Sequence, residues 1–120
     1  MSTIAVITNP GSNFSVKLCT WPSLVNGDAG APLQFTEWAD RAMQVYGTFG
    51  VGGTLVWEGS NDQVAWSTLT DASGVGMSYT ATALKQMTEA PIWIRPRVTA
   101  GDGTTALVAS IAMRRLTTSL

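Results

Sequence analysis

The chain has 120 residues, a formal net charge of −1 and charged side chains at only 12% of its positions. This length suffices for one domain with its own hydrophobic core and is too short for two. The near-zero charge excludes a global attraction to nucleic acid or to an acidic membrane, and the low charged share favours a protein whose surface is largely covered by partners.

Strands are predicted in the N-terminal half, in segments where apolar and polar residues alternate. These segments are separated by the turn-forming residues Gly, Pro and Asn. They lie at residues 4–8, 14–21, 41–49 and 54–58. The segment 23–34 is rich in Gly and Pro and predicts a loop. A glycine-rich turn at 50–53 leads into the last of these strands, in which Leu55 and Trp57 share a face.

The C-terminal half predicts further strands and one short helix. The strands lie at residues 66–70, 77–80, 92–99 and 105–115. The helix covers 83–89, where Ala83, Leu84 and Met87 have helical spacing and Pro91 stops the element. The turn at 100–103 contains Asp-Gly, which predicts a hairpin between the last two strands because this pair tolerates the positive φ angles of tight turns.

About eight short antiparallel strands with at most one short helix are typical of an all-β fold, and we predict a jelly-roll-like β-sandwich. Residues 1–120 are expected to form one domain, with 1–11 as a possible N-terminal arm and 116–120 as a short tail. No apolar run approaches the roughly 20 residues of a membrane helix, and the apolar stretch 4–7 is too short for the core of a signal peptide. We expect synthesis in a cytoplasm without processing and no membrane partner.

The chain lacks the residues that most catalytic sites use. It has no histidine, which is the commonest general base and metal ligand, and its single cysteine, Cys19, cannot build a disulfide or a zinc site. The position of Cys19 in an alternating strand predicts a small core side chain. Asn61, Asp62 and Asp71 could hold a cation in a loop, but turn formation is the preferred interpretation. We predict no catalytic residue, no metal site, no cofactor and no enzymatic activity.

The predicted strand 92–99 carries the strongest signal for a partner. Alternation turns its aliphatic side chains toward the core and leaves a row of three larger side chains on the opposite face: Trp93, Arg95 and Arg97. Because Trp and Arg are enriched at the energetic centres of protein interfaces, this Trp-Arg row predicts a partner-binding surface. The alternative is a solvated face with Trp93 lying over the arginine stems. Pro96 favours an edge strand or a bulge, and two arginines without a wider basic surface argue against direct nucleic-acid binding.

Two further places carry partner signals. Trp38 stands beside acidic residues at the start of a predicted strand and is a candidate interface anchor. The segment 1–11 is uncharged, with Ile4 and Val6 on one face and Ile7 on the other. A strand that is apolar on both faces is either central in a sheet or an arm that adds to a neighbouring subunit, and the sequence leaves both open.

Parts of the chain resemble known domains. The sequence Glu-Gly-Ser-Asn-Asp at 58–62, followed by Trp66, resembles the turn signature of discoidin-like and galactose-binding-like jelly rolls, and the strand 92–99 is similar to their matching strand. The larger frame, from residue 47 to residue 105, is similar to small structural proteins of tailed bacteriophages, most of all to the head decoration or cement proteins of short-tailed phages. The resemblance covers residues 41–115.

This resemblance implies a non-enzymatic protein on the outer surface of a virion capsid, where it would bridge major capsid protein subunits. Homodimers or homotrimers are expected because the symmetry axes of a shell favour small closed oligomers. A carbohydrate-binding module of a phage tail or fibre is the alternative, although the loop 23–34 has no aromatic residue to stack on a sugar. Another virion component, such as a tail-tube or head-completion protein, is a third possibility.

Overall fold

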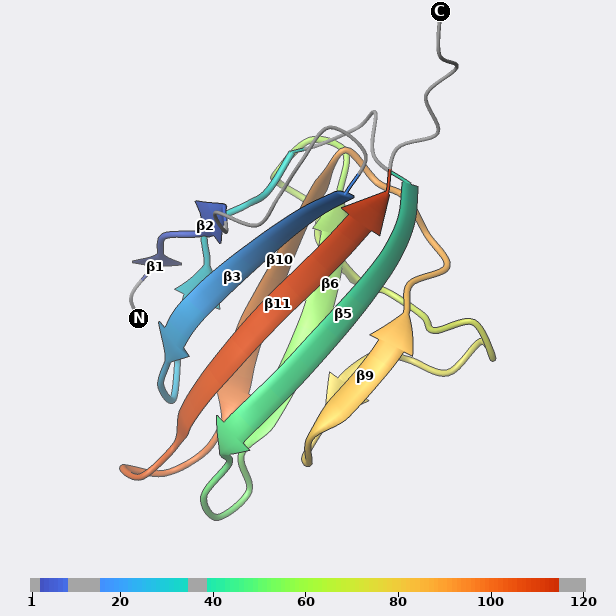
Figure 1. The fold of residues 1–120 in the computed structure, drawn as a ribbon. Coiled ribbons are helices and arrows are strands. Elements are labelled where there is room, and N and C mark those ends of the chain that lie inside the picture. Colours follow the sequence, from blue (N-terminus) through green and yellow to red (C-terminus); the bar gives the residue numbers. More distant parts are fainter. Residues whose placement is uncertain (1–2, 9–15, 35–38, 115–120) are drawn as a thin grey trace, which may run out of the picture.

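The computed structural model describes residues 3–8, 16–34 and 39–114, and these form two β-sheets packed face to face (Figure 1). Within these residues there is no helix, so none that could span a membrane. The predicted all-β sandwich is therefore confirmed.

Sheet A has the strand order β1-β4-β10-β6-β7, and β8 also pairs with β6. Its strands are β1 (Thr3–Ile4), β4 (Ala29–Gly30), β6 (Thr54–Ser60), β7 (Ser67–Thr68), β8 (Ser78–Tyr79) and β10 (Trp93–Ala100). Strands β1 and β4 are parallel, whereas the other described pairs in this sheet are antiparallel.

Sheet B has the strand order β2-β3-β11-β5-β9, and its described pairs are all antiparallel. Its strands are β2 (Ile7–Thr8), β3 (Val16–Leu24), β5 (Ala39–Thr48), β9 (Ala83–Gln86) and β11 (Ala106–Arg114). The long strands β3, β11 and β5 form the centre of this sheet and cover β10 and β6 of sheet A (Figure 1).

The helix predicted over 83–89 is wrong. Residues Ala83–Gln86 form strand β9, which pairs with β5 from Val45↔Ala83 to Ala42↔Gln86. Leu84 is 66% exposed, so the apolar residues do not share one face. A helix of about seven residues is marginal in water, whereas the open edge of β5 offers backbone partners for the same segment.

The hairpin predicted between the last two strands is also wrong. The tight turn exists, since the Thr105 N–H donates to the Asp102 carbonyl at 3.2 Å. However, β10 pairs with β6 and β4 in sheet A, while β11 pairs with β3 and β5 in sheet B. An Asp-Gly turn reverses the chain, but it does not decide whether the flanking strands join the same sheet.

Pro96 lies in an inner strand rather than at the edge or bulge that its missing N–H predicted. On the side of β10 that faces β4, Val98 N–H donates to the Asp28 carbonyl at 2.9 Å and Ile94 N–H donates to the Leu33 carbonyl at 3.0 Å. Pro96 occupies the position between these two bonds, where a donor is absent. The irregularity of β10 comes after Val98.

Trp21 and Pro96 both lie close to Gly30 of β4. The Trp21 Nε1–H donates to the Ala31 carbonyl at 3.1 Å, and a Cβ on Gly30 would come within 2.6 Å of both Trp21 Nε1 and Pro96 Cδ. Trp21 of β3 also meets Trp57 of β6 edge to face, with ring centroids 5.6 Å apart. Both indoles are fully buried, so this pair joins the two sheets at the centre of the core.

Asp102 ties together the two turns that carry the chain between the sheets at one end of the sandwich. Its Oδ2 accepts from the Val51 N–H at 2.9 Å, and its Oδ1 accepts from the Thr104 hydroxyl and N–H at 2.6 and 2.8 Å. The bonds from Thr104 and Val51 lower the pKa of Asp102 to about 2. The β5–β6 turn and the β10–β11 turn are thereby held side by side.

Gly50 and Gly52 make a matched pair to test this clamp, because both have positive φ, +72° and +71°. A Cβ on Gly50 would overlap the Asp102 carboxylate, whereas a Cβ on Gly52 would meet nothing within 4 Å. We expect Gly52→Ala to lower the free energy of unfolding by about 1 kcal/mol through backbone strain alone, and Gly50→Ala to lower it clearly more. Urea unfolding at neutral pH measures both, and equal losses would contradict the clamp.

Candidate functional site

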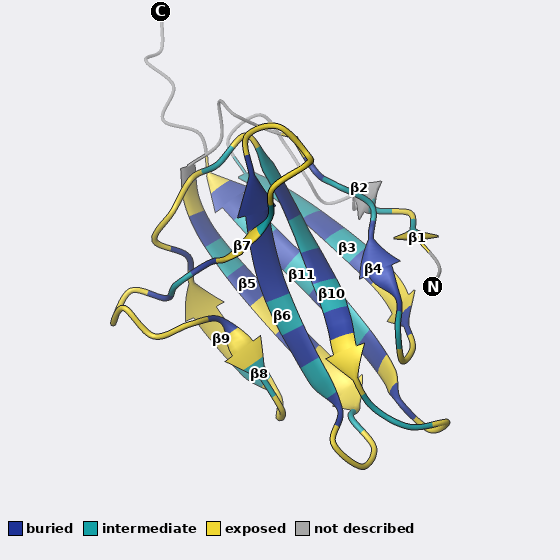
Figure 2. Cartoon of the chain, turned by 180° about the vertical axis from the view of Figure 1, so that it is seen from behind, coloured by how far each residue is buried: buried dark blue, intermediate teal, exposed yellow. Residues whose placement is uncertain are grey.

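The Trp-Arg row lies on the outer face of sheet A. Along β10, Ile94, Pro96 and Val98 are buried, whereas the three members of the row are partly exposed, and Figure 2 shows this alternation. The predicted orientation of Trp93, Arg95 and Arg97 is confirmed, and their role in binding a partner stays a prediction. Ile92, expected to face the core, precedes β10 and is 37% exposed.

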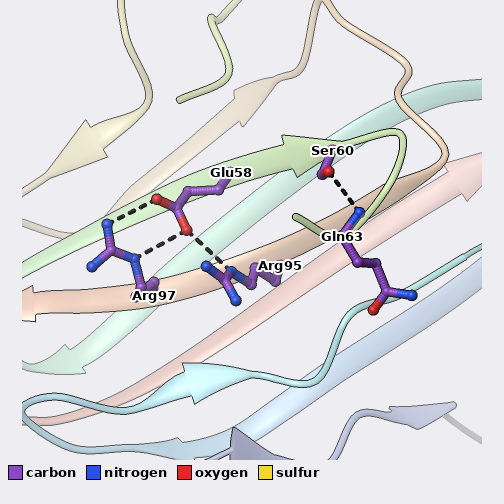
Figure 3. A network of polar contacts seen from close by, with 5 residues as sticks. All are labelled: Glu58, Ser60, Gln63, Arg95 and Arg97. Atoms are coloured by element: carbon purple, nitrogen blue, oxygen red, sulfur yellow. Dashed lines mark hydrogen bonds and ion pairs between the residues drawn. The ribbon is translucent and has the colours of Figure 1, made fainter. Parts of the chain in front are cut away.

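The register of β10 against β6 brings a carboxylate between the two arginines. Arg95 stands opposite Glu58. Glu58 Oε1 accepts from Arg95 Nε at 3.1 Å and from Arg97 Nε at 3.0 Å, and its Oε2 accepts from Arg97 Nη2 at 2.8 Å (Figure 3). The side chain of Glu58 is only 8% exposed, compared with 22% for Arg95 and 37% for Arg97.

The arginines keep this nearly buried carboxylate ionised. Burial by itself would raise the pKa of Glu58, but the hydrogen bonds and charges of Arg97 and Arg95 outweigh burial and lower the pKa. The same bond to Glu58 raises the pKa of Arg97. Because one negative charge faces two positive charges, the cluster carries a net positive charge of one on an otherwise weakly charged surface.

Trp66, which directly precedes β7, completes the cluster. The Arg95 side chain places its Cζ 4.0 Å from the centroid of the Trp66 ring. A guanidinium over an indole face gains cation–π attraction. The sequence places Glu58 and Trp66 only in a turn signature and does not assign them to the Trp-Arg row. The available signal was that Glu58 follows Trp57 on its strand and so must face away from the core.

The turn between β6 and Trp66 is fixed by its own side chains. Ser60 Oγ accepts from the Gln63 N–H at 2.8 Å (Figure 3), and Asp62 Oδ1 accepts from the Val64 and Ala65 N–H groups at 2.9 and 3.0 Å. The bonds that Asp62 accepts from Val64 and Ala65 lower the pKa of its carboxyl group. The turn interpretation of Asp62 is thus confirmed. The described residues contain no group of three or more acidic or cysteine side chains placed for a metal ion.

A cleft of about 580 Å³ opens beside this turn, between the end of β6, the edge strand β7 and residues 89–91. Hydroxyl side chains line part of it, including Ser67 and Thr68. The lining carboxylate, Glu89, already accepts from the Thr70 N–H at 2.8 Å and from the Thr70 hydroxyl at 2.5 Å. The cleft therefore has a mixed polar and apolar lining, and its acidic group is held by the protein itself.

The other predicted partner residues lie elsewhere. Ile4 and Val6 are partly buried against the chain's own core, because β1 pairs with β4 and β2 pairs with β3. A contact of these residues with a partner stays a prediction and would require the segment to leave this place. The backbone of Ile7 pairs with Thr20, but its side chain lies outside the description, as does Trp38 altogether.

No protein-family model and no curated protein matches this chain. Among solved structures, it is similar to the crystal structure of the SPBc2 prophage-derived protein YomS, with a TM-score of 0.62 over 85% of this chain and 96% of that chain. The two sequences are 8% identical. At this identity the likeness shows a shared fold.

We expect Glu58→Gln to lower the free energy of unfolding by about 2 kcal/mol at pH 7, because the two arginines lose a charged acceptor. The folded-state pKa of Glu58 lies below its ordinary value of 4.5, so its contribution is present above that pH and is lost as pH falls below it. The difference between the two proteins should therefore shrink from pH 7 to pH 3.

Urea unfolding at both pH values measures this difference. Lys85→Gln is a suitable control, since it changes one charge at an exposed position of sheet B and should alter little. A difference between wild type and Glu58→Gln that is the same at pH 7 and pH 3 would show that Glu58 is not the ionised acceptor.

Proposed function

We propose that this chain is a structural virion protein that decorates and cements a bacteriophage capsid by bridging subunits of the major capsid protein. The observation that carries the proposal is the outward-facing Trp-Arg row, braced by Glu58 on the solvent side of sheet A. Trp and Arg dominate the energetic centres of interfaces. Side chains that are already fixed lose less freedom when a partner binds, so this row is prepared for association.

The fold supports the same class of protein. A solved structure with a similar fold is a prophage-derived protein, and the sequence resembles phage head decoration proteins over residues 41–115. On this proposal the chain is made in the host cytoplasm and acts on the outer capsid surface. Many identical contacts around a shell would add up, so each interface could be modest in area.

A bridging protein needs a second surface, and sheet B offers one. The register places two rows across its outer face: Leu18, Ala112, Ala42 and Gln86, and beside them Thr20, Ser110, Gln44 and Leu84. None of these side chains is charged. An uncharged sheet face on the side opposite the Trp-Arg row supports contacts between copies, as a homodimer or homotrimer would use.

Co-sedimentation with capsids that lack this protein tests the proposal. Wild type should bind saturably and in a fixed ratio, and the double variant Trp93→Ala, Arg95→Ala should bind at least about tenfold more weakly. Val75→Ala is a control, since Val75 is a 60% exposed loop residue outside the row. Thermal unfolding checks that each variant is folded.

Wild-type protein that fails to bind the shell would refute the proposed function. Wild-type occupancy by the double variant would instead show that the row is not the capsid interface.

A carbohydrate-binding module is the second candidate, and the cleft of about 580 Å³ between β6, β7 and residues 89–91 is the observation that favours it. Sugars stack on free aromatic faces, but Trp66 is not among the residues that line this cleft, and one face of its ring is occupied by Arg95. A glycan array with the same sample separates the two candidates. A clear saccharide signal without shell binding would favour the carbohydrate-binding module.

A further inference from the structure

The two arginines of the cluster use their donors differently. Arg97 donates from Nε and Nη2 to both oxygens of Glu58, so its fork is committed to that carboxylate. Arg95 donates to Glu58 from Nε only. Within the described part of the chain, the Nη1 and Nη2 groups of Arg95 donate no hydrogen bond. Arg95 thus keeps an unused planar edge although it is the less exposed of the two.

The position of this edge is fixed from two sides. The bond from Nε to Glu58 anchors one edge of the guanidinium, and the Trp66 ring lies against one of its faces at 4.0 Å. The Nη edge has no hydrogen-bond partner in the described part of the chain and is not fully buried. A donor pair held in this way needs little reordering to meet an acceptor, which favours binding.

The charge of the cluster selects the acceptor. Two arginines and one glutamate leave a net positive charge of one, so the site attracts an anion. Two parallel N–H donors in one plane match the two oxygens of a carboxylate. Backbones of nucleic acid need several cations along a groove. Here the neighbouring outward residues of sheet A are uncharged: Val56, Ser60, Thr68 and Ser78.

We infer that the Nη edge of Arg95 binds a carboxylate on the surface of a partner protein, with Trp93 packing beside it. This inference rests on the proposed function for the identity of the surface and goes beyond it by naming the group that is recognised. Arg95 is the residue that contacts the partner's carboxylate, whereas Glu58 and Trp66 position Arg95.

The first test follows two NMR signals of isotope-labelled protein: the Arg95 Nε–H group and the indole N–H of Trp66, which the Arg95→Lys variant retains. An acetylated hexaglutamate peptide should shift both signals with millimolar affinity. Arg95→Lys, which keeps the charge but loses the planar fork, should weaken the binding measured at the Trp66 signal at least about tenfold. Arg114→Lys makes the same substitution at an exposed end of sheet B and should leave the binding unchanged. Hexathymidylate serves as the phosphate probe.

Two results of this titration would overturn the inference. One is peptide binding that Arg95→Lys does not weaken. The other is equal or tighter binding of hexathymidylate at Arg95, which would identify a phosphate polymer as the ligand.

The second test repeats capsid co-sedimentation with the two lysine variants. Weaker binding of Arg95→Lys, with Arg114→Lys unchanged, supports the inference. Wild-type occupancy by Arg95→Lys overturns it while the proposed function stands. If the wild-type protein does not bind the shell but the peptide titration succeeds, the proposed function fails and the carboxylate site stands.

Discussion

The antiparallel pairing of β6 with β10 determines both faces of sheet A. It sets Trp57 opposite Pro96 on the inner face and Glu58 opposite Arg95 on the outer face. Because side chains alternate along a strand, a slip by one residue would exchange the two faces. The inner pair makes the contact with Trp21 that joins the sheets, and the outer pair makes the charged cluster. The core and the candidate site therefore depend on the same register.

The charged cluster is unusual in a sheet face because its acid is nearly buried. Removing a carboxylate from water is unfavourable unless it is paired and hydrogen-bonded, and Glu58 accepts bonds on both oxygens. Replacement of such a cluster by apolar residues is often neutral or stabilising in other proteins. Stability alone thus gives little reason for three charges at this place, whereas presentation of Arg95 to a partner gives one.

The sequence predicted the structure correctly where a local rule determines the conformation. Alternation along 92–99 predicted which side chains face outward, and turn chemistry predicted that Asp62 bonds to its own backbone. It failed where the outcome depends on neighbours in space. Residues 83–86 became a strand because β5 has an open edge, and the Asp102 turn joins two sheets because β10 and β11 find other partners. Glu58 was missed for the same reason, since no local rule states which strand lies beside 54–58.

The small number of charged residues also explains why the charge of Arg95 is prominent on the outer face of sheet A. Apart from Asp40 and Glu58, each acidic residue that the structure describes accepts a hydrogen bond within its own loop or from a nearby segment, and these are Asp28, Asp62, Asp71, Glu89 and Asp102. Their charges stabilise turns and are partly neutralised by N–H donors. The outer face of sheet B has uncharged side chains across its centre. On the proposed function, a partner's carboxylate that approaches sheet A would meet little repulsion and the oriented guanidinium of Arg95, which would give specificity to an interface whose remaining area is neutral.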